Sequence, residues 1–232
     1  RLHFLHKLDG TLLQRFQHDG RVYFTTRGMI EGGPCYGSFD ERNKKVARAF
    51  VRLLQAAGVD FTILGNEEKC SGEPARRLGH EYLFQTLAQG NVETLKQYTF
   101  QKIVTACPHC FNTLRNEYPD FDGHFQVIHH SELLDELIAS GRLTVSRERS
   151  ERITYHDACN LGRYNDIYDE PRRVLGSVAR TELLEMTLSR SKGFCCGGGG
   201  GRAWMEETEG RRVNQVRVEQ APKLANKGIS YV

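Results

Sequence analysis

Short apolar runs and longer amphipathic segments alternate along the whole chain. Segment 41–57 carries its apolar residues at helical spacing, and Gly58 follows it where a C-cap glycine would end a helix. A strand-like run at 60–64, a second helical stretch at 74–98 and another strand-like run at 102–106 come next. The first half of the chain is therefore predicted to alternate strands with helices.

The rest of the chain continues this order. Its predicted elements are strands at 125–128, 152–156, 182–186 and 228–232, and helices at 132–140, 170–179 and 203–226. Strands that alternate with helices favour parallel pairing within a sheet. We expect an α/β protein built from two pseudo-symmetric repeats, each a mainly parallel sheet flanked by helices.

Composition and charge narrow the class of protein. The fractions of hydrophobic residues (39%) and charged residues (26%) are typical of a globular domain. The 32 basic and 29 acidic residues are spread evenly, and a net charge of +3 is too weak to indicate nucleic acid as a partner. No apolar run approaches the roughly 20 residues needed to cross a bilayer, and no signal-peptide core follows Arg1. We expect a cytoplasmic location, and the lack of an initiator Met suggests a fragment of a longer protein.

The chain has seven cysteines, and a similar interval separates the cysteine motifs within each half. Between Cys35 and Cys70 there are 34 residues, and between Cys159 and Cys195 there are 35. In the first half, a further 36 residues lead to a Cys-x-x-Cys motif. The repeat therefore predicts a second Cys-x-x-Cys within a few residues beyond Val232.

An odd number of widely spaced cysteines argues against a secreted disulfide framework and for reduced thiols that hold a metal. Iron–sulfur clusters take thiolates, usually two from one short motif and the others from distant loops. Cys107-x-x-Cys110 supplies the close pair, and Cys35 with Cys70 completes four ligands, enough for a [4Fe–4S] cluster. Because the loops after parallel strands gather at one sheet edge, we expect these thiols to converge.

A second set of thiols comes from Cys159, Cys195 and Cys196, which give three ligands of a second site. The glycine run 197–201 follows directly and would let backbone amides approach the sulfurs of a cluster. One feature breaks the pattern: residues 28–34 do not provide the strand expected before the first cysteine.

The arrangement Cys…Cys-Cys-Gly…Cys-Pro-x-Cys resembles the cysteine-rich CCG domain over about residues 35–232. That domain occurs twice in heterodisulfide reductase B subunits and in iron–sulfur subunits of glycolate, lactate and anaerobic glycerol-3-phosphate oxidising enzymes. The stretches 39–43, 107–114 and 156–163 are most similar to membrane-associated iron–sulfur oxidoreductases that connect electron-transfer flavoprotein with menaquinone. The resemblance implies an iron–sulfur electron-transfer subunit or domain of a larger oxidoreductase.

The resemblance also implies partners and domain limits. Other parts of such a complex would be a ferredoxin-type domain, a flavoprotein and a membrane haem or quinone module. One of these, or a preceding N-terminal region, would hold the chain at the cytoplasmic face of the membrane. The predicted domains are an N-terminal segment at 1–34, a first CCG-like repeat at 35–146 and a second repeat at 147–232 that stops before its Cys-x-x-Cys.

An intact motif of this family can hold a noncubane cluster with all five of its cysteines. The second motif keeps Cys159 and the pair Cys195–Cys196, so the resemblance implies a noncubane cluster there. In the first motif Lys69 stands where the first cysteine of the pair belongs, which implies an ordinary cubane or a degenerate site. We therefore expect one or two [4Fe–4S] clusters, the second noncubane.

Two other classes of function remain open. Cys107-Pro-His-Cys110, placed after a strand and before a helix, is also typical of a thioredoxin-like thiol–disulfide oxidoreductase. Four thiolates could instead hold structural zinc in an interaction module. Adjacent cysteines and a glycine run fit a cluster better than zinc.

Three histidines have open roles, and no catalytic residue is assigned. His129 and His130 could be ligands or proton carriers, although such a pair more often caps a helix and fills a loop. His156 lies three residues before Cys159, where it could transfer protons or make a structural hydrogen bond.

Overall fold

The computed structural model divides into two compact units, Arg1–His130 and Ser131–Val232, which are described separately. The described residues are 4–6, 12–14, 22–25, 41–145, 152–178, 182–202, 210–220 and 229–231. These two units are defined by contacts within the folded backbone. The domain ranges 1–34, 35–146 and 147–232 were predicted from the cysteine motif, and they stay a prediction.

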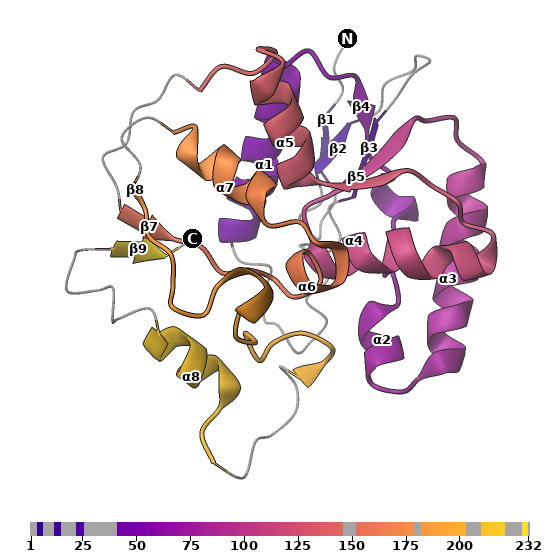
Figure 1. Ribbon diagram of the computed structural model, residues 1–232. Coiled ribbons are helices and arrows are strands. Elements are labelled where there is room, and N and C mark those ends of the chain that lie inside the picture. Colours follow the sequence, from indigo (N-terminus) through magenta and orange to yellow (C-terminus); the bar gives the residue numbers. More distant parts are fainter. Residues whose placement is uncertain are drawn as a thin grey trace. The chain divides into compact units, whose positions relative to one another are not determined.

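The first unit contains a four-stranded, wholly parallel sheet with strand order β4-β3-β5-β6 (Figure 1). Its strands are β3 (Val22–Thr25), β4 (Phe61–Thr62), β5 (Lys102–Thr105) and β6 (Val127–His129). Strand β3, which precedes Cys35 in the chain, was not predicted from the sequence. Residues 28–34 and Cys35 itself lie outside the described residues. A separate antiparallel pair joins β1 (Phe4–His6) to β2 (Leu12–Gln14).

Helix α1 (Glu41–Ala56) forms where the apolar spacing predicted it. Phe50 and Leu54, four residues apart, lie on one face of the helix and are buried. Gly58 ends the helix in the left-handed conformation at φ +61°. The Val59 N–H then donates to the Leu54 carbonyl at 2.9 Å, which satisfies a carbonyl that the helix leaves free.

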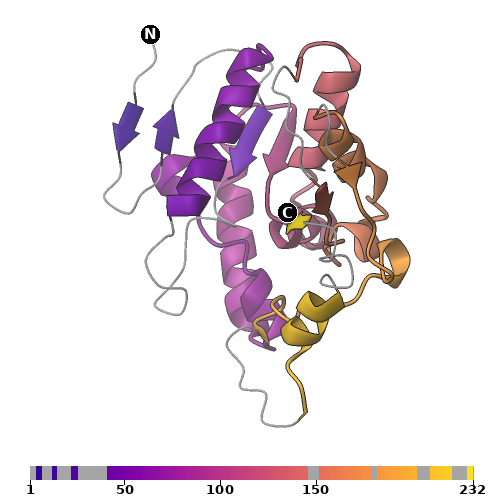
Figure 2. The same ribbon diagram turned by 90° about the vertical axis from the view of Figure 1, so that its left-hand side faces the viewer.

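The second helical stretch predicted in this unit forms two helices, α2 (Glu73–Arg77) and α3 (Glu81–Lys96), rather than one (Figure 2). Gly79 takes φ +84° between them, a conformation that interrupts a helix. His80 caps α3, because its Nδ1 accepts a hydrogen bond from the Leu83 N–H at 3.3 Å. The prediction of a single helix was wrong because the apolar spacing continues across this turn.

A short helix, α4 (Pro108–Asn112), begins just after β5 and continues through a π-helical turn at 113–117 and a 3-10 turn at 118–121. The core of the unit joins these segments to α3 and β5. Its largest fully buried side chains include Phe84, Ile103, Val104, Phe111 and Tyr118.

The second unit has a three-stranded parallel sheet with strand order β8-β7-β9. The strands are β7 (Arg152–Thr154), β8 (Glu182–Leu183) and β9 (Ile229–Tyr231). Ile153 of the central strand pairs with Leu183 on one side and with Ser230 on the other. Both units therefore have the parallel strand pairing expected of the α/β repeats.

The second unit is completed by helices and by a small apolar core. The helices are α6 (Gly162–Asn165), α7 (Asp169–Gly176) and α8 (Val213–Gln220), together with α5 (His130–Ala139), which begins at the border of the units. Buried apolar residues include Leu133, Leu137, Ile153, Leu161, Ile167 and Met186. Of the predicted helix at 203–226, residues 203–209 and 221–228 lie outside the described residues. Within the ranges that the structure describes, no helix has the length and apolar character of a membrane span.

Candidate cysteine-rich sites

Two thiols of the first unit are brought together by the Cys-x-x-Cys motif at the end of β5. Cys107 is the N-cap residue of α4, and its N–H donates to the Thr105 hydroxyl at 3.2 Å. A hydrogen bond from the Cys110 thiol lowers the pKa of Cys107 to about 6, against the opposing effect of burial. The same bond, burial and the charges of Cys107 and Cys70 raise the pKa of Cys110. One thiol of the pair is therefore readily ionised and the other holds its proton.

The loop that carries Cys70 is anchored beside this pair. The Ser71 hydroxyl lies 3.6 Å from the sulfur of Cys110. Asn91 donates from Nδ2 to the carbonyl of Cys70 at 2.8 Å, and the buried Tyr118 hydroxyl donates to the carbonyl of Ser71 at 3.2 Å. The structure thus brings three of the four cysteines predicted for the first site into one neighbourhood.

Lys69, which replaces a cysteine of the family motif, lines the same cavity as Cys110. The cavity holds about 400 Å³ of space, part of which is open to solvent. Its other walls include Ser71, Asn91 and Tyr118, the residues that fix the loop. Lys69, at the position where the resemblance implies a cysteine, thus shares the lining of this cavity with Cys110.

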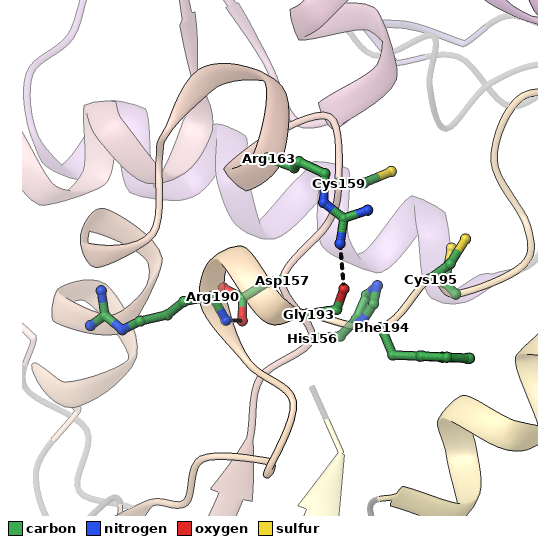
Figure 3. Close-up of a pocket in the computed structure, with 9 residues that line it drawn as sticks. His156, Asp157, Cys159, Arg163, Arg190, Gly193, Phe194 and Cys195 are labelled. Atoms are coloured by element: carbon green, nitrogen blue, oxygen red, sulfur yellow. Dashed lines mark hydrogen bonds between the residues drawn. The ribbon is translucent and has the colours of Figure 1, made fainter.

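The three thiols of the second unit line one pocket (Figure 3). Cys159 follows β7, and Cys195 and Cys196 lie in the loop after β8. In Figure 3, the side chains of Cys159 and Cys195 project from two separate loops toward the same side. Arg163 connects the two loops by donating from Nη2 to the carbonyl of Gly193 at 2.6 Å.

The pKa values of two of these thiols are shifted in opposite directions. A hydrogen bond from His156, together with the backbone N–H groups of Gly198 and Gly199, lowers the pKa of Cys196 to about 6 against the opposing effect of burial. Burial raises the pKa of Cys159, and the charges of Cys196 and Cys195 add to that effect. Mutual repulsion of this kind is removed when thiolates bind a positively charged metal.

The glycine run places backbone donors on the sulfurs, as predicted from the sequence. The Gly197 N–H donates to the sulfur of Cys195 at 3.3 Å, and the Gly198 N–H donates to the sulfur of Cys196 at 3.4 Å. Gly197 takes φ +75°, and a Cβ atom there would lie 2.9 Å from the backbone nitrogen of Asn214. Only glycine fits both the backbone conformation and this close approach.

A buried ion pair, one member of which lines this pocket, was not predicted from the sequence. Arg172 donates to both carboxylate oxygens of Asp157, at 2.7 and 3.0 Å, and also to Glu185 at 2.5 and 2.8 Å. Asp157 accepts a further bond from the Arg190 N–H at 2.6 Å. Asp157 lies two residues before Cys159, so this network fixes the loop that presents the thiol.

The histidine pair joins β6 to α5: His129 ends the strand and is buried, and His130 is the first residue of the helix and is half-buried. The His129 Nε2 lies 3.3 Å from the carbonyl oxygen of Ala106, and the two imidazole rings are 4.2 Å apart. Burial lowers the pKa of His129 to about 3 and that of His130 to about 4. Both rings are therefore neutral at physiological pH and pack in the core.

The donor set can be tested against the group that it would bind. Among the described side chains, no three of Cys, His, Asp and Glu are arranged to hold a single metal ion. Soft thiolates in two groups, with N–H groups directed at the sulfurs, fit a cluster.

The fold and these sites place the chain in a family. The model of the cysteine-rich domain CCG matches residues 33–115 and 153–230, one match in each half. The chain belongs to this cysteine-rich CCG domain family and carries the domain twice.

Relatives with curated names fall into the same class. The chain is 48% identical over 199 residues to a probable iron-sulfur-binding oxidoreductase FadF of Bacillus subtilis, covering 84% of this chain and 28% of that protein. It is 46% identical over 193 residues to the EtfAB:quinone oxidoreductase of Syntrophomonas wolfei, covering 80% of this chain and 27% of that protein. It is also 35% identical over 162 residues to one polypeptide of the dihydromethanophenazine:CoB–CoM heterodisulfide reductase of Methanosarcina mazei, covering 67% of this chain and 40% of that polypeptide. The chain therefore spans less than half the length of these relatives.

Proposed function

We propose that this chain is an electron-transfer domain of a larger iron–sulfur oxidoreductase and that its two cysteine-rich sites hold iron–sulfur clusters. The observation that carries the proposal is the gathering of thiols from distant segments at one place in each unit. In the second unit, backbone N–H groups also point at two of the sulfurs. The named functions of the relatives support the same class.

At the first site, the ligands would be Cys70, Cys107 and Cys110 together with Cys35, and we propose an ordinary [4Fe–4S] cluster. Four thiolates suffice for a cubane. Lys69 lines the same cavity as Cys110, at the position where the resemblance implies a fifth thiol. A cation there would offset part of the negative charge of a thiolate-bound cluster.

At the second site, Cys159, Cys195 and Cys196 would be ligands, and we propose a noncubane cluster completed by a further Cys-x-x-Cys. The hydrogen bond from His156 lowers the pKa of the Cys196 thiol to about 6, so this ligand is readily ionised. The amides of Gly197 and Gly198 would stabilise negative charge on the sulfurs.

A cluster would supply a centre that accepts and releases electrons at little cost in reorganisation. The thiolates of this chain would bind the cluster, and the amides and His156 direct N–H groups at the sulfurs. The Asp157–Arg172 pair fixes the loop that carries Cys159. The names of the relatives suggest a flavoprotein as donor and a quinone or a disulfide as acceptor. We propose a ferredoxin-type domain and a membrane haem or quinone module as the neighbouring parts.

A thiol–disulfide activity at Cys107 and Cys110 is the second candidate. One observation favours it: the pKa of Cys107 is lowered to about 6 while that of its neighbour is raised, the division of roles that such enzymes use.

Metal and sulfide analysis separates these functions. The complete natural polypeptide is purified without oxygen, and iron, zinc and acid-labile sulfide are measured. About four iron atoms and four sulfides for each cubane are expected. Cys110→Ser should lower the iron and sulfide contents because it removes a ligand of the first site. Cys196→Ser should lower them because it removes a ligand of the second site. Zinc without sulfide, or metal-free protein with a reducible Cys107–Cys110 disulfide, would overturn the proposal.

A further inference from the structure

Arg217 is buried in the second unit although its side chain carries a permanent charge. Only 5% of the residue is exposed, and it lies on α8, outside the cysteine motifs. Burial lowers the pKa of Arg217, and the negative charges that oppose this effect come from Asp157 and Cys196. Its Nη2 atom is buried and has no hydrogen-bond partner among the described residues. Burying a cation costs free energy of desolvation, so the contacts of Arg217 should account for its burial.

The contacts of the guanidinium group fix its direction. Nη1 donates to the carbonyl of Leu188 at 2.9 Å and to the side chain of Gln220 at 2.7 Å. These two bonds hold the planar group so that Nε donates to Nδ1 of His156 at 3.0 Å. Arg217 therefore reaches, across 61 positions of sequence, the histidine next to the second thiol site.

This bond determines which nitrogen of His156 carries the proton. Arginine only donates, so Nδ1 must accept and carries no proton. The neutral ring then carries its proton on Nε2. This nitrogen can donate the hydrogen bond that His156 makes to the thiol of Cys196. His156 and Cys196 also line the same pocket.

We propose that Arg217 is a positioning residue: it holds His156 as the Nε2–H tautomer, which donates to the Cys196 sulfur and raises the reduction potential of the cluster at the second site. This inference rests on the proposed function. A hydrogen bond to a ligand sulfur stabilises the more negative, reduced state of a cluster more than the oxidised state. The nearby guanidinium charge acts in the same direction.

The first experiment compares reduction potentials in the complete natural polypeptide by redox titration monitored with electron paramagnetic resonance. Arg217→Met keeps the aliphatic stem and removes the donor. We expect the ratio of reduced to oxidised second-site cluster, at a fixed applied potential, to fall about tenfold, which is ~59 mV for one electron. Arg212→Met is the matched control, because Arg212 is exposed just before α8 and carries the same charge. It should leave the potential unchanged.

A double-mutant cycle tests the route through the histidine. If Arg217 acts through His156, Arg217→Met should change the potential much less in a His156→Phe background than in the natural background. The hyperfine coupling of an exchangeable proton near the cluster should disappear in His156→Phe and change in Arg217→Met. Equal potential shifts in both backgrounds would mean that the guanidinium acts by charge alone, and they would overturn the proposal.

A further variant covers the case in which Arg217→Met does not retain the cluster. Arg217→Lys keeps the charge but lacks the planar group that bonds His156 and Leu188 together. The proposal requires a lowered potential in both Arg217→Lys and His156→Phe, and an unchanged potential in either one contradicts it. Iron and sulfide contents are measured in the natural protein first. Their absence would refute the proposed function, whereas normal contents with unchanged potentials would refute this inference alone.

Discussion

The hydroxyl oxygen of Ser71 lies 3.6 Å from the sulfur of Cys110, although 39 positions separate the two residues. The contact depends on Tyr118, which is fully buried and bonds to the carbonyl of Ser71, and on Asn91, which bonds to both Cys70 and Tyr118. The loop after β4 is thereby fixed beside the Cys-x-x-Cys motif. Two side chains that bind no metal position the first site.

Removing the Tyr118 hydroxyl should loosen this loop. Tyr118→Phe leaves the buried Ser71 carbonyl and the Asn91 amide short of a partner, so we expect a loss of about 1–3 kcal/mol in the free energy of unfolding. Urea denaturation measures this loss. Tyr82→Phe is the control, because Tyr82 is 80% exposed and its variant should match the natural protein. Equal stability of the two variants would contradict the positioning role.

The buried pair of Asp157 and Arg172 should be costly to break. Arg172→Met leaves an unpaired buried carboxylate, and we expect a loss of about 3–5 kcal/mol in the free energy of unfolding. Arg173→Met is the control: Arg173 bonds to Asp135 but is more than half exposed, so its loss should stay below about 1 kcal/mol. Denaturant titration of both variants measures the difference, and similar losses would show that burial of the pair contributes nothing.

The same pair should make the free energy of unfolding depend on pH in acidic solution. Burial alone would raise the pKa of Asp157, but the bonds from Arg172 and from the Arg190 N–H lower it below the ordinary value. A carboxylate with a lowered pKa stabilises the fold above its unfolded-state pKa of about 4, and this stability is lost as the pH falls. We expect Asp157→Asn to be less stable than the natural protein at pH 7, with the difference shrinking toward pH 2. A difference independent of pH would argue against an ionised Asp157.

The glycine run can be tested by one added methyl group. Gly197→Ala places a Cβ atom 2.9 Å from a backbone nitrogen and keeps φ at +75°, whereas the Cβ atom of Gly210→Ala, at φ +69°, would have none of the described residues within 4 Å. Both should lose about 1 kcal/mol for the left-handed conformation, and Gly197→Ala should lose more. We also expect only Gly197→Ala to reduce the iron bound at the second site. Thermal unfolding and iron analysis measure the two effects.

Alkylation of the metal-free protein should distinguish the thiols of the first site. The pKa of Cys107 is lowered to about 6 by the bond from Cys110, so its reaction with iodoacetamide should rise through pH 6 and level off by pH 7. Cys110, whose pKa is raised, should react slowly throughout this range. In Cys110→Ala the rise for Cys107 should move to higher pH. Mass spectrometry of the labelled peptides reads each site separately.

Much of the architecture follows from local patterns in the sequence. Helix α1, its glycine cap and the strands β5 and β7 form where apolar spacing and turn residues predicted them. The Cys-x-x-Cys motif joins its two thiols because only two residues lie between them, which is a local property of the chain. The break at Gly79 was missed because Leu78 and Tyr82 continue the helical spacing across it, and β3 was missed although its β-branched and aromatic residues are typical of a strand.

By itself, the sequence determined the α/β alternation, the repeat of the cysteine motif and therefore which thiols to compare. Only the tertiary structure decided which groups surround them: Tyr118 beneath Ser71, Arg172 against Asp157, and Arg217 on His156. Each of these contacts joins residues distant in the chain, and an arginine in a polar helix is indistinguishable by pattern from a solvated one. Burial and hydrogen bonding, which arise only when the segments pack together, give these residues their roles.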